Sequence, residues 1–221
     1  MAIHYASDAA AAAAVHASLP GEGHVVVHGD LRNADAVREM VDSAAASLGG
    51  IDVLINNAGV FYSHPIQSAT YEQWQQAWTD TLGVNLIGAA NATWCALQHM
   101  PRSGGSRIVN VGSRGAFRGE PDSPAYGASK AAIVAFGQSI AKALAPEGIA
   151  VTTLAPGFVE TDMAKDHLTG DSGREIRGQS PFNRVAAPHE LADAIVFLAS
   201  AEAEWASGAV LDFNGASYLR I

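Results

Sequence analysis

Short runs of β-branched and other apolar residues alternate with longer helical segments along most of this chain. Such runs are typical of strands buried in a parallel sheet, and the segments between them are long enough for crossover helices. The alternation predicts right-handed β-α-β units, with helices covering both faces of the sheet. We expect strands at residues 3–5, 24–28, 51–55, 107–111, 149–154 and 208–213, and helices at 8–18, 34–48, 71–99, 126–144 and 188–200.

Several helix ends carry local signals. Ser7 and Asn33 are placed to cap the two helices that follow them, and Gly49 with Gly50 ends the second one. Residues 158–184 show no clear period, so we expect an irregular segment there.

Length and charge narrow the class of protein. The 221 residues suffice for one domain with a substantial core, so we treat 1–221 as a single domain. A formal charge of −9 without a basic stripe argues against nucleic acid and anionic membranes as partners. No apolar run approaches the ~20 residues that cross a bilayer. Cys95 is the one cysteine, which favours a reducing compartment, the cytoplasm.

Distinctive residues stand where four of the expected strands end. These residues are Asp30, Asn57, Ser113 and Pro156. Because ligands bind beyond the carboxyl ends of the strands in open α/β sheets, we expect the four positions to border one site.

Tyr126 and Lys130 lie four residues apart on an expected helix, so their side chains share one face. A nearby ammonium lowers the pKa of a phenol from its usual ~10, which would let Tyr126 pass a proton near neutral pH. Ser113 can hydrogen-bond the same substrate oxygen, and Asn85 could hold a water that relays protons to Lys130. This arrangement would polarise a ketone for hydride attack, and the hydride must come from a cofactor.

With these residues the sequence resembles the short-chain dehydrogenase/reductase family, especially its ketone and 3-oxoacyl-thioester reductases. The matching pieces, in family order, are Asn56-Asn57-Ala58-Gly59, Asn85, Ser113, Tyr126-x-x-x-Lys130, Pro156-Gly157-Phe158-Val159-Glu160-Thr161 and residues 208–215. The resemblance implies a three-layer Rossmann-like doubly wound parallel sheet. It also implies an NAD(P)-dependent oxidoreductase that reduces a ketone or oxidises a secondary alcohol, assembled as a homodimer or homotetramer.

The resemblance further implies roles for individual residues. The catalytic residues would be Asn85, Ser113, Tyr126 and Lys130. The cofactor would be bound by Asp30, Leu31, Asn57, Ala58, Gly59, Tyr126, Lys130, Pro156, Gly157, Val159 and Thr161. No histidine spacing suggests a metal site, and we expect His64, His99, His167 and His189 on the surface or in a substrate loop.

Each of these residues also has an ordinary structural interpretation. Asp30 could satisfy loop amides, Asn57 could stiffen the sheet, Ser113 could be a turn hydroxyl, Asn85 could mark a helix irregularity and Thr161 could cap a helix. Substrate could be met by residues 158–184, including Met163, His167, Leu168 and Phe182, or by Arg114, Phe117 and Arg118, which are equally consistent with a solvated loop.

One part of the family pattern is missing, namely the first strand, its glycine-rich turn and a helix, about one β-α unit. Gly21-Glu22-Gly23 precedes a strand, so it cannot be that turn. We therefore expect an N-terminally truncated sheet in which residues 3–6 shift toward the empty central position, or in which pairing between chains covers it. Cofactor phosphates should also bind more weakly.

The cofactor and the activity remain open between alternatives. The tip of the first expected strand, His4-Tyr5-Ala6-Ser7, carries no acid to hold a ribose hydroxyl, which favours NADP while leaving NAD possible. The missing turn favours a second interpretation, a binding or scaffold protein of the same fold with little turnover. A complete Asn-Ser-Tyr-Lys set favours the enzyme.

Overall fold

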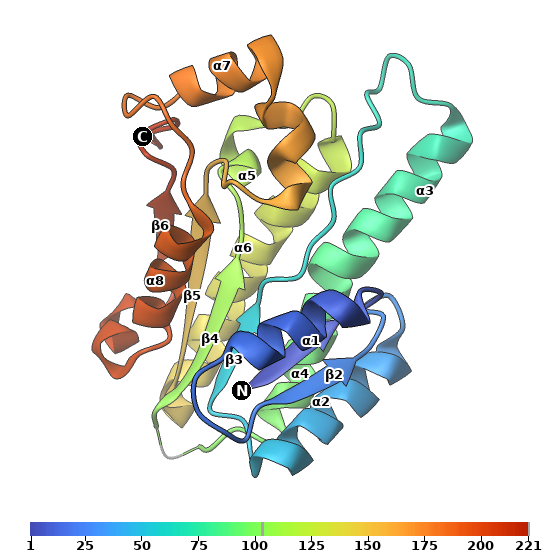
Figure 1. Cartoon of the computed structure of the whole chain (residues 1–221). Helices are drawn as coiled ribbons and strands as arrows, with labels where there is room; N and C mark the ends of the chain where they lie inside the picture. The colour runs from blue at the N-terminus through green and yellow to red at the C-terminus, as the bar shows by residue number, and fades with distance from the viewer. Residues whose placement is uncertain (103, 221) are drawn as a thin grey trace.

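The computed structural model describes residues 1–102 and 104–220 (Figure 1). In this described part, six strands form two parallel sheets. One sheet pairs β1 (Ala2–Tyr5) with β2 (Val25–His28). The other contains, in spatial and chain order, β3 (Val53–Asn56), β4 (Ser106–Val111), β5 (Ile149–Pro156) and β6 (Val210–Phe213).

Helices connect nearly all of these strands. The α-helices are α1 (Ala9–Ser18), α2 (Ala34–Leu48), α3 (Tyr71–Leu82), α4 (Ala89–Leu97), α5 (Gly115–Arg118), α6 (Pro124–Leu144), α7 (Gly170–Gly178) and α8 (Pro188–Leu198). Shorter turns are the π-helical η1 (Gly83–Gly88) and the 3₁₀ segments η2 (Ala145–Glu147), η3 (Asp162–Leu168) and η4 (Ala201–Ala206). None of the described helices is long and apolar enough to span a membrane.

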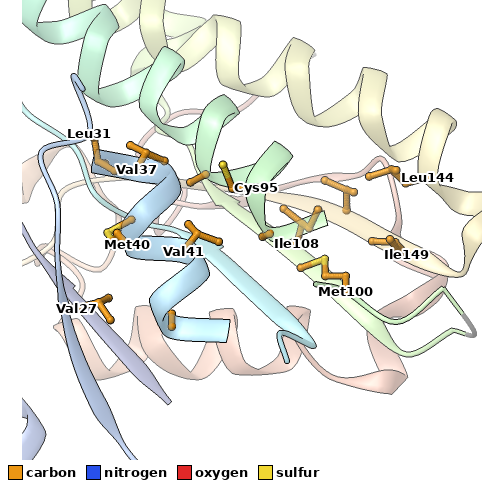
Figure 2. Packing of buried hydrophobic residues seen from close by; sticks show 14 of the residues in the cluster. Val27, Leu31, Val37, Met40, Val41, Cys95, Met100, Ile108, Leu144 and Ile149 are labelled. Carbon is orange, nitrogen blue, oxygen red and sulfur yellow. The ribbon is translucent and has the colours of Figure 1, made fainter. Parts of the chain in front are cut away.

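The helices lie on both faces of the sheets. Figure 1 shows α1 and α8 on one face, with α2, α4 and α6 on the other. Successive side chains of β4 point to opposite faces of the sheet. Ile108 joins the larger apolar cluster with Val37 and Cys95, shown in Figure 2, and Val109 joins a smaller cluster with Leu198 of α8. The doubly wound α/β class predicted from the sequence is therefore confirmed.

The parallel order is interrupted between β1 and β3. Within the described residues, β1 pairs with β2 only, and β3 pairs with β4 only. The predicted shift of residues 3–6 toward a central strand is therefore wrong. A parallel backbone ladder holds β1 to β2, and two side-chain contacts add to it: His4 Nε2 lies 2.8 Å from the Gly29 carbonyl, and His28 Nε2 lies 3.1 Å from the Ala6 carbonyl. As a result β3 keeps an open edge, where Val53 is 41% exposed.

The helix caps are formed by the residues that the sequence predicts, with one exception. Asn33 caps α2 through bonds to the next amides, and Gly49 ends it in the left-handed conformation, with φ of 81°. The helix at residue 9 is capped by Asp8, not by Ser7: the Asp8 carboxylate accepts a 2.8 Å hydrogen bond from the Ala11 amide. A carboxylate at this position also complements the positive end of the helix dipole.

Two segments differ from what the sequence predicts. The single helix expected at 71–99 is divided into α3, η1 and α4, because the chain takes a π-helical turn from Gly83 to Gly88. The segment expected to be irregular, 158–184, contains η3 and α7. Glycines at both ends of α7 conceal its periodicity in the sequence.

Candidate active site

Helix α6 carries Tyr126 and Lys130 into the interior at the end of β4. The Lys130 side chain is 5% exposed, and its Nζ donates a 2.8 Å hydrogen bond to the Val111 carbonyl. The same nitrogen lies 5.7 Å from the centroid of the Tyr126 ring. The two side chains therefore share one helix face, as their spacing predicts.

Burial controls the protonation of both groups. It lowers the pKa of Lys130 from 10.5 to about 8. It also raises the pKa of Tyr126 above 10.0, although a hydrogen bond from Ser113 opposes this and Glu120 adds to it. The predicted lowering of the Tyr126 pKa by Lys130 is therefore wrong for this structure. Loss of hydration disfavours the phenolate more than the neighbouring groups favour it.

The buried lysine predicts a pH-dependent stability. The unfolded chain holds this proton up to 10.5, whereas the folded chain releases it at about 8. The unfolded state therefore binds more protons between these values, and stability should rise with pH, by about 2 kcal/mol from pH 8 to 10. We expect the free energy of unfolding of the wild type, measured relative to Lys130→Met by urea denaturation, to be flat below pH 7 and to rise above it. If the difference in free energy of unfolding between wild type and Lys130→Met stays constant up to pH 10, the lowered pKa of Lys130 is contradicted.

Ser113 follows β4 directly and faces the phenol. Its hydroxyl accepts a 3.0 Å hydrogen bond from the Gly115 amide and lowers the pKa of Tyr126. The hydroxyl thus serves the turn and the phenol together. The next residue, Arg114, donates its amide to the Pro156 carbonyl at 2.8 Å, which joins the ends of β4 and β5.

Asn85 lies in the π-helical turn η1 and is buried. Its amide oxygen accepts a hydrogen bond from the Val60 amide at 2.8 Å, and its amide nitrogen donates to the Val60 carbonyl at 3.0 Å and to Ser129 Oγ at 3.1 Å. The helix irregularity that the sequence left open is therefore real, and it turns Asn85 onto the loop after β3. Such π-turns recur at functional sites.

Gly59 packs closely against this asparagine and the lysine. A Cβ built at Gly59 would lie 3.3 Å from Asn85 Oδ1 and 3.5 Å from Lys130 Nζ. The Lys130 ammonium has three N–H donors, and the bond to Val111 uses one of them. A sugar with two hydroxyls can accept hydrogen bonds from the remaining donors, so the residues present fit the ribose of a nicotinamide cofactor.

The remaining residues of the loop after β3 have divided roles. Asn57 and Ala58 are exposed. The stiffening of the sheet considered for Asn57 is performed by its neighbour Asn56, whose amide nitrogen donates to Thr93 Oγ1 at 3.0 Å and to Asn110 Oδ1 at 2.9 Å. Asn57 is thus left at the surface beside Gly59.

The loop after β2 holds Asp30 and Leu31. Arg32 binds the Asp30 carboxylate through its backbone amide at 2.9 Å and its guanidinium at 2.7 Å, and lowers the pKa of Asp30 to about 2. Asp30 therefore accepts a hydrogen bond from a loop amide, which is the structural role that the sequence left open for it. The Leu31 side chain lies in the larger apolar cluster.

The end of β5 and the loop after it carry the last four predicted cofactor residues. Pro156 and Gly157 bond to Arg114 and Phe213 at the ends of neighbouring strands. Val159 forms an isolated parallel bridge with Ala186. Thr161 stands directly before η3 without a side-chain capping bond, so the helix-cap interpretation does not apply.

His64 was expected at the surface or in a substrate loop, but it is 2% exposed. Its Nε2 accepts a 3.1 Å hydrogen bond from the Ala125 amide, so Nδ1 carries the proton and donates to the Tyr62 carbonyl at 2.7 Å. Ala125 lies in the first turn of α6, where Ser123 offers no side-chain cap. His64 thus caps the helix that carries Tyr126. No local pattern could reveal this contact, which joins residues 61 positions apart.

Removing this cap has a predictable cost. His64→Ala leaves a buried amide without an acceptor, so we expect a loss of about 2 kcal/mol in the free energy of unfolding. His64→Gln places an amide oxygen near the same position and should recover part of that loss. Urea denaturation of both variants measures the difference, and equal stability of the two would show that the contact to Ala125 contributes nothing.

Comparison with known proteins identifies the family of this chain. A family model described as enoyl-(acyl carrier protein) reductase matches residues 1–215. The 3-oxoacyl-[acyl-carrier-protein] reductase FabG of Vibrio cholerae is 33% identical over 190 residues, covering 86% of this chain and 76% of that protein. The protein of the same name from Staphylococcus aureus is 30% identical over 221 residues, covering 99% and 88%.

Solved structures give the same result. A dehydrogenase/reductase from Sinorhizobium meliloti superposes with a TM-score of 0.89 at 28% identity, covering 99% of this chain and 84% of that one. A short-chain dehydrogenase from Burkholderia cenocepacia, solved in complex with NADP, gives 0.88 at 31% identity, covering 98% and 86%. The chain therefore belongs to the short-chain dehydrogenase/reductase family of oxidoreductases and is similar to its 3-oxoacyl reductases.

Proposed function

We propose that this protein reduces the ketone of a 3-oxoacyl thioester or a related small carbonyl compound with NADPH, and oxidises the corresponding secondary alcohol in reverse. The observation that carries the proposal is the buried Lys130 beside Tyr126, with Ser113 facing the same phenol. These groups together bind and protonate a carbonyl oxygen. Similarity to reductases named for 3-oxoacyl substrates supports the substrate class.

The residues divide the chemistry as follows. Ser113 donates a hydrogen bond to the substrate oxygen and Tyr126 transfers its proton to that oxygen. A raised pKa keeps the phenol protonated, which suits a proton donor in the reducing direction. Lys130 supplies positive charge next to the phenol below pH 8, and its N–H groups bind the cofactor ribose. NADPH, when bound, supplies the hydride.

Asn85 positions this machinery. Its side chain fixes the loop at Val60 and contacts Ser129 one residue from Lys130. A water beside Asn85 that relays protons to Lys130 remains part of the proposal. Hydrogen bonds to Val60 fix the orientation of the buried Asn85 amide, so a water bound to that amide has little freedom of position.

NADP is the preferred cofactor in this proposal, with NAD as the alternative. The end of β1 carries no free acid near it to select an unphosphorylated ribose: the Asp8 carboxylate is engaged by the Ala11 amide at the start of α1. Two structural relatives support the choice, the Burkholderia protein with NADP and a metagenomic blue fluorescent protein solved with NADPH. Asp30, Leu31, Asn57, Ala58, Gly59, Pro156, Gly157, Val159 and Thr161 are the proposed cofactor contacts besides Tyr126 and Lys130.

The test combines binding and turnover. The protein is titrated with NADPH and with NADH by cofactor fluorescence, and NADPH oxidation is then followed with a short-chain 3-oxoacyl thioester. We expect saturation with NADPH below millimolar concentration, weaker binding of NADH, and thioester-dependent oxidation. Absence of saturation by either cofactor up to several millimolar would overturn the proposal and favour the scaffold alternative, which neither the complete site nor the named relatives support.

The proposal also covers the oligomeric state of the protein. Large apolar side chains are exposed on α4 and on the β6 edge, namely Trp94 and Leu211. Such side chains on separate faces are typical of subunit contacts. We infer a homodimer or homotetramer that uses the α4 and α6 faces and the β6 edge, and light scattering of the purified protein measures which one forms.

A further inference from the structure

A cavity of about 250 Å³ lies beside the ends of β5 and β6. Residues lining it include Arg114, Phe158, Phe182, Glu190 and Asp212. Neither the four catalytic candidates nor the proposed cofactor contacts line it, so the residues that carry the proposed reaction do not account for it. Its walls combine aromatic rings with charged groups, a mixture that suits a ligand with one apolar and one charged end.

Arg114 places a buried cation in the wall of this cavity. The side chain is 3% exposed, contrary to a solvated loop charge. Its guanidinium donates hydrogen bonds to Ser217 Oγ and, at 2.6 Å, to Gln179 Oε1, and it stacks 5.2 Å from the centroid of the Phe158 ring. All three partners are uncharged. Among the described side chains, no carboxylate forms an ion pair with Arg114.

The other charges of the cavity are already paired. Arg184 binds Glu190 through two hydrogen bonds of 2.6 and 2.7 Å, and Asp212 binds Arg220 at 2.8 Å. Arg114 is therefore the charged group in this wall that forms no direct ion pair with a described side chain, and the Glu120 carboxylate attracts it only from a longer distance. Burial without a direct ion pair is costly, and it lowers the pKa of Arg114 to about 10.

We propose that the cavity binds a small organic carboxylate. The carboxylate occupies the position beside Arg114, and the apolar body of the ligand packs against Phe158 and Phe182. A guanidinium has five N–H donors in a planar fork that matches a carboxylate, and the bonds to Ser217 and Gln179 use two of them. Phe182 is 72% exposed, so it stands at the mouth where the ligand enters.

The experiment measures binding without cofactor or substrate, so its outcome is independent of the proposed reductase activity. Isothermal titration is carried out with benzoate and hexanoate, with benzamide as the neutral counterpart of benzoate and with inorganic phosphate as an anion lacking an apolar body. We expect saturable binding of the two carboxylates and at least tenfold weaker binding of benzamide and phosphate. Equal binding of benzoate and benzamide, or no binding of either carboxylate, would overturn the proposal.

Variants locate the site. Arg114→Gln should weaken benzoate at least tenfold, whereas Arg102→Gln, which removes an arginine that is paired with Glu147 and does not line the cavity, should leave it unchanged. Phe182→Glu adds a negative charge at the exposed mouth and should weaken benzoate even if Arg114→Gln does not fold. Wild-type affinity for benzoate in Phe182→Glu would refute this location.

Discussion

Replacing Tyr126 by phenylalanine is expected to reduce carbonyl reduction about 10²- to 10⁴-fold, the range typical of a general acid. The variant keeps the ring and its edge-to-face contact with Phe61, at 5.0 Å between centroids, so packing is preserved. The loss should fall on kcat, because the proton is transferred at the transition state. Steady-state NADPH oxidation with a 3-oxoacyl thioester measures it.

The control for this variant is Tyr71→Phe. Tyr71 lies in the first turn of α3 and is exposed, so loss of its hydroxyl should leave both kcat and stability unchanged. Undiminished turnover by Tyr126→Phe, in a preparation whose wild type is active, would remove Tyr126 from the reaction. A similar loss in both variants would point to a general effect of removing a hydroxyl.

Substituting Gly88 by alanine is expected to destabilise the fold by about 2–3 kcal/mol and to lower Tm by about 5–10 °C. A Cβ at this position would lie 2.6 Å from Leu31 Cβ and 2.7 Å from the Leu31 carbonyl oxygen. Backbone atoms cannot rotate away, so η1 and the loop after β2 must separate. Thermal unfolding followed by circular dichroism measures the change.

Gly178→Ala is the matched control, because it makes the same change in the last turn of α7. A Cβ there meets no atom within 4 Å, so only helix propensity changes and stability should stay equal or rise slightly. If Gly88→Ala and Gly178→Ala unfold at the same temperature, the close approach of η1 to Leu31 has no energetic importance.

Much of this fold could be predicted from short stretches of the sequence, and the features that could not be predicted have identifiable causes. Strands β4 and β5 could be predicted because every residue in them is buried, and the Asn33 cap could be predicted because its bonds lie within three residues. The π-helical turn at Gly83–Gly88 could not be predicted, because it depends on how closely Gly88 packs against Leu31. The empty position between β1 and β3 could be expected from the missing β-α unit, but the pairing of β1 with β2 alone could not, because it depends on contacts between distant segments.

The candidate site divides in the same way. The spacing of Tyr126 and Lys130 predicts their shared face, since that relation lies within one helix. The direction of the Tyr126 pKa could not be predicted, because it depends on how much water the folded chain removes. His64 and Arg114 gain their roles from contacts with residues more than 60 positions away.

The break in the parallel order divides the molecule into regions of unequal resistance to opening. Strands β1 and β2 form a small unit with α1, whose residues are mostly exposed, whereas β4 and β5 are buried throughout. Backbone amides of residues 2–28 should therefore exchange with deuterium through local fluctuations, while those of β4 and β5 exchange only when the whole chain unfolds. The protein thus combines a rigid region around Lys130 with a mobile first unit on the slower timescale that hydrogen exchange reports.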